Sequence, residues 1–347
     1  MNSKKKRPTI KQVAQASGVS TQTVSRVINN RPDVADETRQ RVKGIIQEIG
    51  YQPSALARSL IRNRSYTLGV VTAGLKYIGP NRTLNGITTT AEEVGYSLLL
   101  KELPNYNAND VKPIVNEFIS RHVEGIIWAA PEIGSNRDWV DGFQNDLNVP
   151  FVFLTMGPRD GLSIISVDNY HGGRLATSHL FENGYRNIAH IAGPLDWWEA
   201  QERFKAWKDV IGAAGCEDVG RCWAGGNWSS ASGRDAMKEL LAKYPEMDAI
   251  FVANDQMALG ALSAINSRGL RVPEDIGVVG FDNIAESAYF WPSLTTIQHN
   301  NIQVGTLAVQ ELISMIDSYE NNENIQHHIR MLKPELLVRN SSLRSKN

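Results

Sequence analysis

Four side chains between residues 21 and 26 could read the base edges of duplex DNA. They are Thr21, Gln22, Ser25 and Arg26. A glutamine can form two hydrogen bonds with an adenine edge, an arginine can do the same with guanine, and a threonine offers a methyl group and a hydroxyl. We therefore expect these side chains on the outer face of a helix that lies in the major groove. The plainer alternative is that the hydroxyl groups only cap and solvate that helix.

A second set of side chains suits a neutral ligand that is rich in hydroxyl groups. Asp282 can accept two hydroxyl protons, Asn254 can both donate and accept, and Arg203 offers a fork of donors. An aromatic face can also stack on the C–H face of a sugar ring. The candidates for such a platform lie in loop-like stretches: Trp197, Trp198 and Trp228. For each of these tryptophans, packing alone is the alternative.

Helical periodicity places the first set on the second of three short helices. Thr9 can cap a first helix, Gly18 can end it because glycine tolerates a positive φ, and Ser20 can cap a second helix. The third helix should stop at Gly50 and bury its own aliphatic stripe. The stripes expected inside are Ile10, Val13 and Ala14, then Val24, Val27 and Ile28, then Val42, Ile45, Ile46 and Ile49. Three such helices indicate a helix-turn-helix domain over residues 1–52.

Residues 53–64 form a short segment of their own after this domain. The sequence PSALARSLIRNR has apolar side chains at helical spacing, but a helix of that length is not stable alone in water. We expect it to fold as a hinge only when DNA and a second copy of the chain support it. Leu60 could then act as an apolar wedge in the minor groove. The alternative is a plain linker helix.

From residue 65 onward, β-type runs alternate with helical stretches, which is typical of parallel sheets built from βαβ units. The runs include YTLGVVT, EGIIWAA, NIAHIAG, AIFVAND and IGVVGFDN. They are too many for one open sheet, so we expect an α/β core with two lobes over residues 65–347. The predicted first lobe covers residues 65–167 and 300–325, and the second covers residues 168–290 and 327–341.

Ligands of such sheets sit beyond the carboxyl ends of the strands. The residues that end the predicted strands are Tyr77, Trp128, Asn254, Asp255, Asp282 and His299. We interpret Asp255 as a cap of the helix that follows it.

Charge divides the chain into a basic head and an acidic body. Residues 1–64 contain 13 Lys and Arg against four Asp and Glu, a net charge of +9. The remaining residues contain 23 basic and 33 acidic side chains, a net charge of −10. This asymmetry indicates a polyanionic partner for the head only. A solvated basic tail is the alternative.

Several functional classes are disfavoured by the sequence. Cys216 and Cys222 are too few for a closed zinc site or a disulfide framework, so free thiols in a reducing cytoplasm are expected. The N-terminus lacks the apolar core of a signal peptide, and no apolar run is long enough for a membrane span. Nucleophile-elbow, zinc-protease and phosphate-loop motifs are missing, and adjacent His327 and His328 would point to opposite faces of a strand. We therefore expect no enzyme, no cofactor and no metal site.

The stretch TIKQVAQASGVSTQTVSRVINN and the later GYQPSALARSL resemble the DNA-binding head of the lactose-repressor (LacI) family. The resemblance covers residues 8–64 almost without gaps. It implies that Thr21, Gln22 and Arg26 read bases. It also implies contacts with the DNA backbone and the minor groove from Asn29 and from the hinge, where Ala57 and Leu60 fall at the positions that the family inserts between base pairs.

The stretches VANDQMALGAL, GLRVPEDIGVVGFDN and PSLTTI resemble the second lobe of the same family. The effector core of that family resembles periplasmic sugar-binding proteins of the ribose type. The resemblance implies a periplasmic-binding-protein-like fold and places Tyr77 at a first-lobe position that is often aromatic. It implies effector contacts from Arg203, Trp228, Asn254, Asp282 and His299.

Three departures from the family pattern bear on the identity of the effector. Thr155 and Met156 stand where ribose-type binders have an Asp-Arg pair, and His299 stands where Gln is common. Trp197 and Trp198 enlarge an edge of the site that is small in the lactose repressor. These departures favour a bulky or oligomeric sugar. A purine-type effector is the alternative within the family.

Together these features predict a transcriptional regulator, of the repressor type, whose operator affinity is controlled by a sugar between two lobes. A sugar-binding transport or chemotaxis receptor is the rival from another class, and the missing signal peptide and the DNA-reading head argue against it. The C-terminal stretch PELLVRNSSLRSKN lacks the leucine heptads of tetrameric members. We therefore expect a homodimer and a pseudo-palindromic operator.

Overall fold

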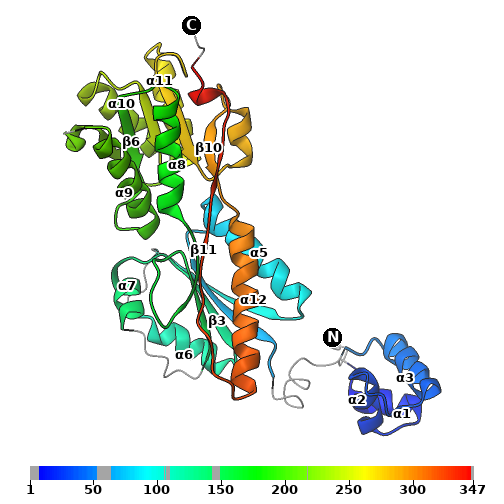
Figure 1. Ribbon diagram of the computed structural model, residues 1–347. Helices are drawn as coiled ribbons and strands as arrows, with labels where there is room; N and C mark the ends of the chain where they lie inside the picture. The colour runs from blue at the N-terminus through cyan, green and yellow to red at the C-terminus, as the bar shows by residue number, and fades with distance from the viewer. Residues whose placement is uncertain are drawn as a thin grey trace, which may run out of the picture. The chain divides into compact units, whose positions relative to one another are not determined.

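A computed structural model describes residues 8–52, 64–104, 106, 110–142, 149–216 and 218–344. The chain divides into two units, Met1–Tyr66 and Thr67–Asn347. In the first unit the described residues form three helices, α1 (Ile10–Ser17), α2 (Thr21–Ile28) and α3 (Asp36–Ile49) (Figure 1). This is the predicted helix-turn-helix arrangement followed by a third helix.

Local hydrogen bonds and one glycine set the turn between α1 and α2. Thr9 accepts a hydrogen bond from the Gln12 N–H, and the Gln12 side chain accepts one from the Thr9 N–H, which makes a capping box. Gly18 ends α1 with φ at 66°, where other residues would be strained. Ser20 then accepts a hydrogen bond from the Thr23 N–H at 3.0 Å and begins α2. All three positions agree with the sequence-based prediction.

The core of the first unit is small. Its buried apolar side chains are Val13, Ala14, Val24, Val27, Val34 and Val42. On α3 only Val42 is fully buried, whereas Ile45, Ile46 and Ile49 are partly exposed. The prediction that α3 buries all four is therefore wrong, because a domain of this size has too little interior to enclose them.

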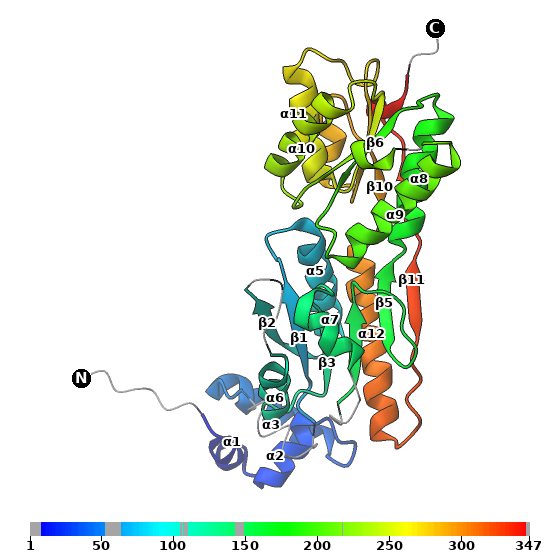
Figure 2. The ribbon, with the colours of Figure 1, turned by 90° about the vertical axis from the view of Figure 1, so that its left-hand side faces the viewer.

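The second unit contains two six-stranded sheets, one in each lobe. The first sheet has the order β11-β5-β4-β3-β1-β2, and every pairing in it is parallel. Its strands are β1 (Thr67–Ala73), β2 (Ser97–Leu103), β3 (Gly125–Ala129), β4 (Phe151–Leu154), β5 (Ser163–Val167) and β11 (Ile329–Leu332). The helices of this lobe are α5 (Ile78–Glu93), α6 (Lys112–Ser120), α7 (Gly134–Asp141) and α12 (Asn301–Glu320). Helix α12 packs on β3, β4 and β5 (Figure 2).

The second sheet has the order β12-β10-β9-β8-β6-β7, and only the β10–β12 pairing is antiparallel. Its strands are β6 (Ile188–Ala192), β7 (Trp223–Gly225), β8 (Ala249–Val252), β9 (Gly277–Phe281), β10 (Thr295–Gln298) and β12 (Glu335–Leu337). The helices are α8 (Asn169–Glu182), α9 (Trp198–Ala213), α10 (Ser230–Lys243) and α11 (Asp255–Ser267). Three 3-10 turns complete the lobe: Val219–Arg221, Ala285–Tyr289 and Asn340–Ser342. Strands buried on both faces explain the continuous apolar runs in the sequence.

The chain passes between the lobes at three places, between β5 and α8, between β10 and α12, and between β11 and β12. The third passage corrects the predicted lobe boundaries, which give all of residues 327–341 to the second lobe. Residues 329–332 instead form β11 and pair with β5 in the first sheet, and only β12 joins the second sheet (Figure 1). The reason is that one extended segment supplies an edge strand to both sheets in turn.

Neither a membrane-spanning helix nor a metal cluster is found among the described residues. No helix there is both long and apolar enough to cross a bilayer. No group of three or more His, Cys, Asp or Glu side chains there is arranged to hold a metal ion. The two cysteines are free, with their sulfur atoms 3.9 Å apart.

Candidate functional site

Helix α2 turns its polar face to solvent. Thr21, Gln22 and Arg26 are exposed and Ser25 is partly buried, while Val24 on the opposite face is fully buried. A helix with this distribution can approach a groove of DNA without disturbing the core of its domain. The base-reading roles of these residues remain predictions.

Two contacts hold the C-terminal end of α2. Asn29 donates a hydrogen bond from Nδ2 to the Ser25 carbonyl at 2.8 Å. Arg26 Nη1 lies 3.3 Å from the Asp33 carboxylate, with both side chains about half exposed. An exposed ion pair of this kind contributes about 0–1 kcal/mol, so the guanidinium could leave Asp33 for a guanine edge at little cost. The predicted hinge contacts, Ala57 and Leu60, lie outside the described residues.

A cavity lies between the two lobes of the second unit. It encloses about 1060 Å³ of space, open solvent included. Residues at or beyond the carboxyl ends of strands from both sheets line it, which is where parallel α/β sheets hold ligands. All eight residues that the sequence singles out for ligand binding line this cavity: Tyr77, Trp197, Trp198, Arg203, Trp228, Asn254, Asp282 and His299.

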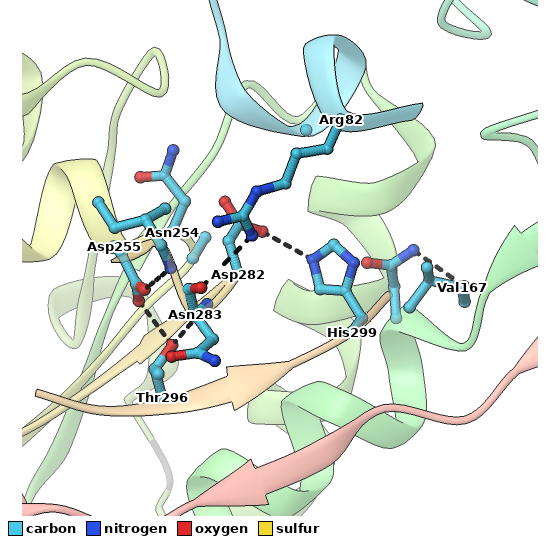
Figure 3. Close-up of polar contacts among 12 residues, drawn as sticks. Arg82, Val167, Asn254, Asp255, Asp282, Asn283, Thr296 and His299 are labelled. Carbon is cyan, nitrogen blue, oxygen red and sulfur yellow. Dashed lines mark hydrogen bonds and ion pairs between the residues drawn. The ribbon is translucent and has the colours of Figure 1, made fainter. Parts of the chain in front are cut away.

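Asp282, directly after β9, lies at the centre of a polar network in this cavity. Its carboxylate accepts a hydrogen bond from His299 Nε2 at 2.9 Å (Figure 3). It also lies 3.7 Å from Arg203 Nη1. In the neutral form of an imidazole that faces a carboxylate through Nε2, the proton lies on that nitrogen and Nδ1 is an acceptor. His299 Nδ1 is buried and has no hydrogen-bond partner in the protein.

Arg203 ties several strand ends to this network. It donates from Nε to the Asn169 side chain at 2.8 Å and from Nη1 to the Ala253 carbonyl at 2.6 Å. Its guanidinium carbon lies 3.6 Å from the ring centroid of Phe281. Only 6% of the residue is exposed, and this burial lowers the pKa of Arg203. These partners compensate the buried positive charge of Arg203. Because Asp282 is one of them, Arg203 both lines the cavity and positions the Asp282 carboxylate.

Helix α11 is capped by Asn254 and not by Asp255, the residue that the sequence suggests as the cap. Asn254 is the cap of α11, since its side chain accepts a hydrogen bond from the Met257 N–H at 2.8 Å. Asp255 is instead the first residue of the helix and is fully buried, and its carboxylate accepts hydrogen bonds from the Ile284 N–H and the Thr296 hydroxyl (Figure 3). Burial, with Asp282 nearby, raises the pKa of Asp255 to about 8. The interpretation of Asp255 as a cap is wrong because the helix begins one residue earlier than its pattern indicates.

Aromatic rings connect the two lobes at the cavity. Trp197 lies edge-on to Trp228 with ring centroids 5.9 Å apart, and Tyr106 of the first lobe lies 5.4 Å from Trp197. Tyr77, also from the first lobe, donates a hydrogen bond from its hydroxyl to the Asn227 carbonyl at 3.2 Å. These contacts hold the lobes together across the cavity while leaving ring surface along its wall.

Three residues that line the cavity have a positive φ although they are not glycine. The values are 55° for Thr155, 70° for Trp228 and 108° for Asp282. Each follows the end of a strand, β4, β7 and β9 in turn. Strained backbone of this kind persists only where the surroundings enforce it, and it gathers at functional sites.

Sequence reasoning missed several polar residues of the cavity, Asn169 and Glu199 among them, and singled out one aromatic that lies elsewhere. Glu199 follows two residues already singled out, so its place after the predicted end of β6 could have identified it. Trp128, at the end of β3, is fully buried and packs against Trp139 with ring centroids 4.6 Å apart. It belongs to the core of the first lobe and not to the cavity.

Comparisons with known proteins agree with this architecture. Residues 9–54 match the family described as bacterial regulatory proteins, lacI family, and residues 177–342 match the periplasmic binding protein-like domain. The HTH-type transcriptional repressor PurR of Pasteurella multocida (strain Pm70) is 35% identical, over 96% of this chain and 98% of that protein. The PurR of Glaesserella parasuis serovar 5 (strain SH0165) is 36% identical, over 98% and 99%.

This chain belongs to the lacI family of bacterial regulatory proteins.

Solved structures of transcriptional regulators extend the likeness to the whole fold. The lac repressor dimer bound to operator and the anti-inducer ONPF has a TM-score of 0.86 and 30% identity, covering 98% of this chain and all of the other. The transcriptional regulator CelR in complex with cellobiose has a TM-score of 0.70 and 30% identity, covering 96% and 100%. As a member of the lacI family, the chain is a DNA-binding transcriptional repressor and not an enzyme.

Replacing Arg26 with alanine should weaken specific operator binding by about tenfold or more, with a much smaller loss for random DNA. The reason is that a bidentate arginine–guanine contact contributes about 1–3 kcal/mol of discrimination, whereas a phosphate contact serves all sequences alike. Fluorescence anisotropy with an operator and a scrambled duplex measures both affinities. Lys43→Ala, which removes an exposed cation of α3, is the matched control and should lower the two affinities about equally. Equal losses for Arg26→Ala would contradict base reading.

Proposed function

We propose that this lacI-family repressor binds its operator through α2 and releases or tightens that contact when a carbohydrate occupies the cavity between its lobes. The observation that carries the effector class is the cavity wall itself. It combines aromatic rings with two carboxylates, four amides, an arginine and a histidine. A sugar matches this wall because each hydroxyl can both donate and accept, while its C–H faces stack on indole rings.

The three passages of the chain between the lobes would carry the signal. The cavity wall includes Val167 and Asn169 beside the first passage, and His299 and Asn301 beside the second. A ligand that bridges the lobes would fix their relative orientation and thereby the spacing of the two hinge segments, residues 53–64, in a dimer. Couplings of this type typically amount to about 1–3 kcal/mol.

A purine is the second candidate for the effector, and the names of the curated relatives favour it. They are called PurR and are 32–36% identical to this chain. The CelR structure, by contrast, contains cellobiose and is 30% identical. Because this chain is about equally similar to the PurR proteins and to CelR, sequence identity does not distinguish a purine effector from a sugar effector. The choice therefore depends on the cavity. The large aromatic edge made by Trp197 and Trp198 supports a sugar of more than one ring.

Two measurements test the proposal. Selection of random duplexes with the full chain should yield a pseudo-palindromic operator, whose affinity should fall steeply with salt because cationic side chains contact phosphates. Calorimetric titration with cellobiose, lactose and glucose, alongside hypoxanthine and guanine, should then show binding of a sugar. Adding that sugar should change the affinity for the operator. Binding of a purine alone would overturn the carbohydrate assignment and leave the repressor intact.

We further propose that the repressor acts as a homodimer in the cytoplasm, in keeping with the lac repressor dimer. The second lobe carries three exposed apolar side chains that a second copy could cover. Trp291 is 95% exposed and Tyr289 is 88% exposed, and Leu259 lies on α11. The hydrogen bond between Asp255 and the Ile284 N–H ties the start of α11 to the 3-10 turn that holds Tyr289.

Trp291→Asp should convert the dimer into a monomer at micromolar concentration, because a charge replaces the largest apolar side chain of this surface. Light scattering coupled to size exclusion measures the mass. The control is Tyr319→Asp, an exposed aromatic on α12 of the first lobe, which should leave the mass unchanged. A Trp291→Asp protein that keeps the dimer mass would place the interface elsewhere.

A further inference from the structure

Three buried polar atoms of the cavity residues have no hydrogen-bond partner in the protein. They are Glu199 Oε2, Trp228 Nε1 and His299 Nδ1. Leaving such a group unpaired destabilises a protein, and native proteins pair nearly all of them. Finding three around one cavity indicates that a ligand supplies the missing partners.

Glu199 is the residue of this trio to which the sequence analysis assigns no role. It lies in the first turn of α9 and is partly buried as a residue, while its Oε2 atom has no access to solvent. Arg203, one turn further along α9, is the cation nearest in sequence. Its guanidinium already serves Asn169, the Ala253 carbonyl and Asp282. The protein therefore provides Glu199 with no dedicated counter-charge among the described contacts.

We propose that Glu199 is a specificity-determining residue of the cavity, which in its ionised form accepts a hydrogen bond from an effector hydroxyl. This inference rests on the carbohydrate effector proposed above and adds its recognition pattern. Trp228 Nε1 can only donate, and His299 Nδ1 accepts while Nε2 faces Asp282. Two acceptors and one donor around a single cavity match a polyol, whose hydroxyl groups can serve in either role.

The surroundings of Glu199 predict that effector binding depends on pH. The pKa of its carboxyl is raised to about 7, chiefly by burial; Glu132 and Asp282 act in the same direction, and Arg203 opposes them. These groups come from the segment after β3, from the end of β9 and from α9 itself. A ligand that requires the ionised carboxylate must displace a proton below that pKa. The affinity of the wild-type protein should therefore be about tenfold higher at pH 8 than at pH 6.

Calorimetry on the full chain with the five probes above tests this inference. For whichever probe binds, Glu199→Gln should weaken binding at least tenfold at pH 8 and make the dissociation constant nearly independent of pH. Glu199→Ala should weaken binding further. The matched control is Glu202→Gln on the same helix, whose side chain does not line the cavity and whose removal should leave both affinity and pH profile unchanged. If the Glu199→Gln protein bound the probe with the affinity and the pH dependence of the wild type, the proposal would be overturned.

Thermal unfolding without ligand gives a second, independent readout. The folded pKa of Glu199 lies above the ordinary value of 4.5, so the folded protein loses stability as pH rises from 4.5 through 7. Glu199→Gln should therefore raise Tm at pH 8 and leave it unchanged at pH 4.5. An unchanged Tm at pH 8 would overturn the proposal even if none of the five probes binds. If no sugar binds, but a purine binds and Glu199→Gln weakens that binding, only the assignment of the effector as a carbohydrate would be overturned.

Discussion

Replacing Asp282 with asparagine should weaken effector binding by at least about 30-fold and remove the effector's influence on the operator. A hydrogen bond to a charged group contributes about 1.5–3 kcal/mol, and a loss of about 2 kcal/mol corresponds to about 30-fold in affinity. The introduced amide must also place its oxygen toward His299 Nε2, which needs an acceptor. Its nitrogen would then present a donor in place of the second carboxylate oxygen.

Asparagine is the informative substitution because the backbone at this position is unusual. Asp282 has φ at 108°, which asparagine tolerates better than alanine does. Operator affinity without effector should remain within a few-fold of the wild type, since α2 belongs to the other unit of the chain. Fluorescence anisotropy of operator, with and without the bound probe, measures both quantities.

Asp275→Asn is the matched control for this experiment. Asp275 forms a surface pair with Arg271 in the second lobe and does not line the cavity. The control should respond to effector like the wild type. An Asp282→Asn repressor that still responds fully would show that the signal does not pass through this carboxylate.

The residues that line the cavity could be predicted because a simple rule relates sequence to position in parallel sheets. Asn254, Asp282 and His299 each follow an apolar run, and every such run ends at the same edge of its sheet. The loop residues Trp197 and Trp228 follow β6 and β7 in the same way. The rule needs no knowledge of side-chain packing, which is why it succeeds from sequence alone.

The rule is insufficient where the direction of a side chain decides its role. Trp128 also ends a strand, but it points into the core and packs on Trp139. Asp255 is buried against Thr296, a partner 41 residues away that no local pattern reveals. The predicted lobe boundary around β11 is wrong for the same reason, because the pairing of this strand with β5 joins segments that are distant in the sequence. Long-range partners of this kind depend on the assembled fold.

Gly260→Ala should destabilise the second unit by about 3 kcal/mol and lower its Tm by about 6–12 °C. Helices α10 and α11 cross at Gly233 and Gly260. A Cβ atom at Gly260 would lie 1.9 Å from the Ser230 carbonyl oxygen and 2.6 Å from the Arg234 nitrogen. Both are backbone atoms, which cannot rotate away as a side chain can, so the helices must separate. Separation would open gaps between two helices that cover the second sheet.

Gly212→Ala is the control that isolates this effect from helix propensity. Gly212 lies in α9, and a Cβ atom there would meet nothing within 4 Å. Alanine is favoured over glycine in helices by up to about 1 kcal/mol, so Gly212→Ala should leave Tm unchanged or raise it. Propensity would favour alanine at position 260 as well, so a fall in Tm there must come from the crossing. If both variants were as stable as the wild type, close approach of α10 and α11 would not be needed for the fold of this lobe.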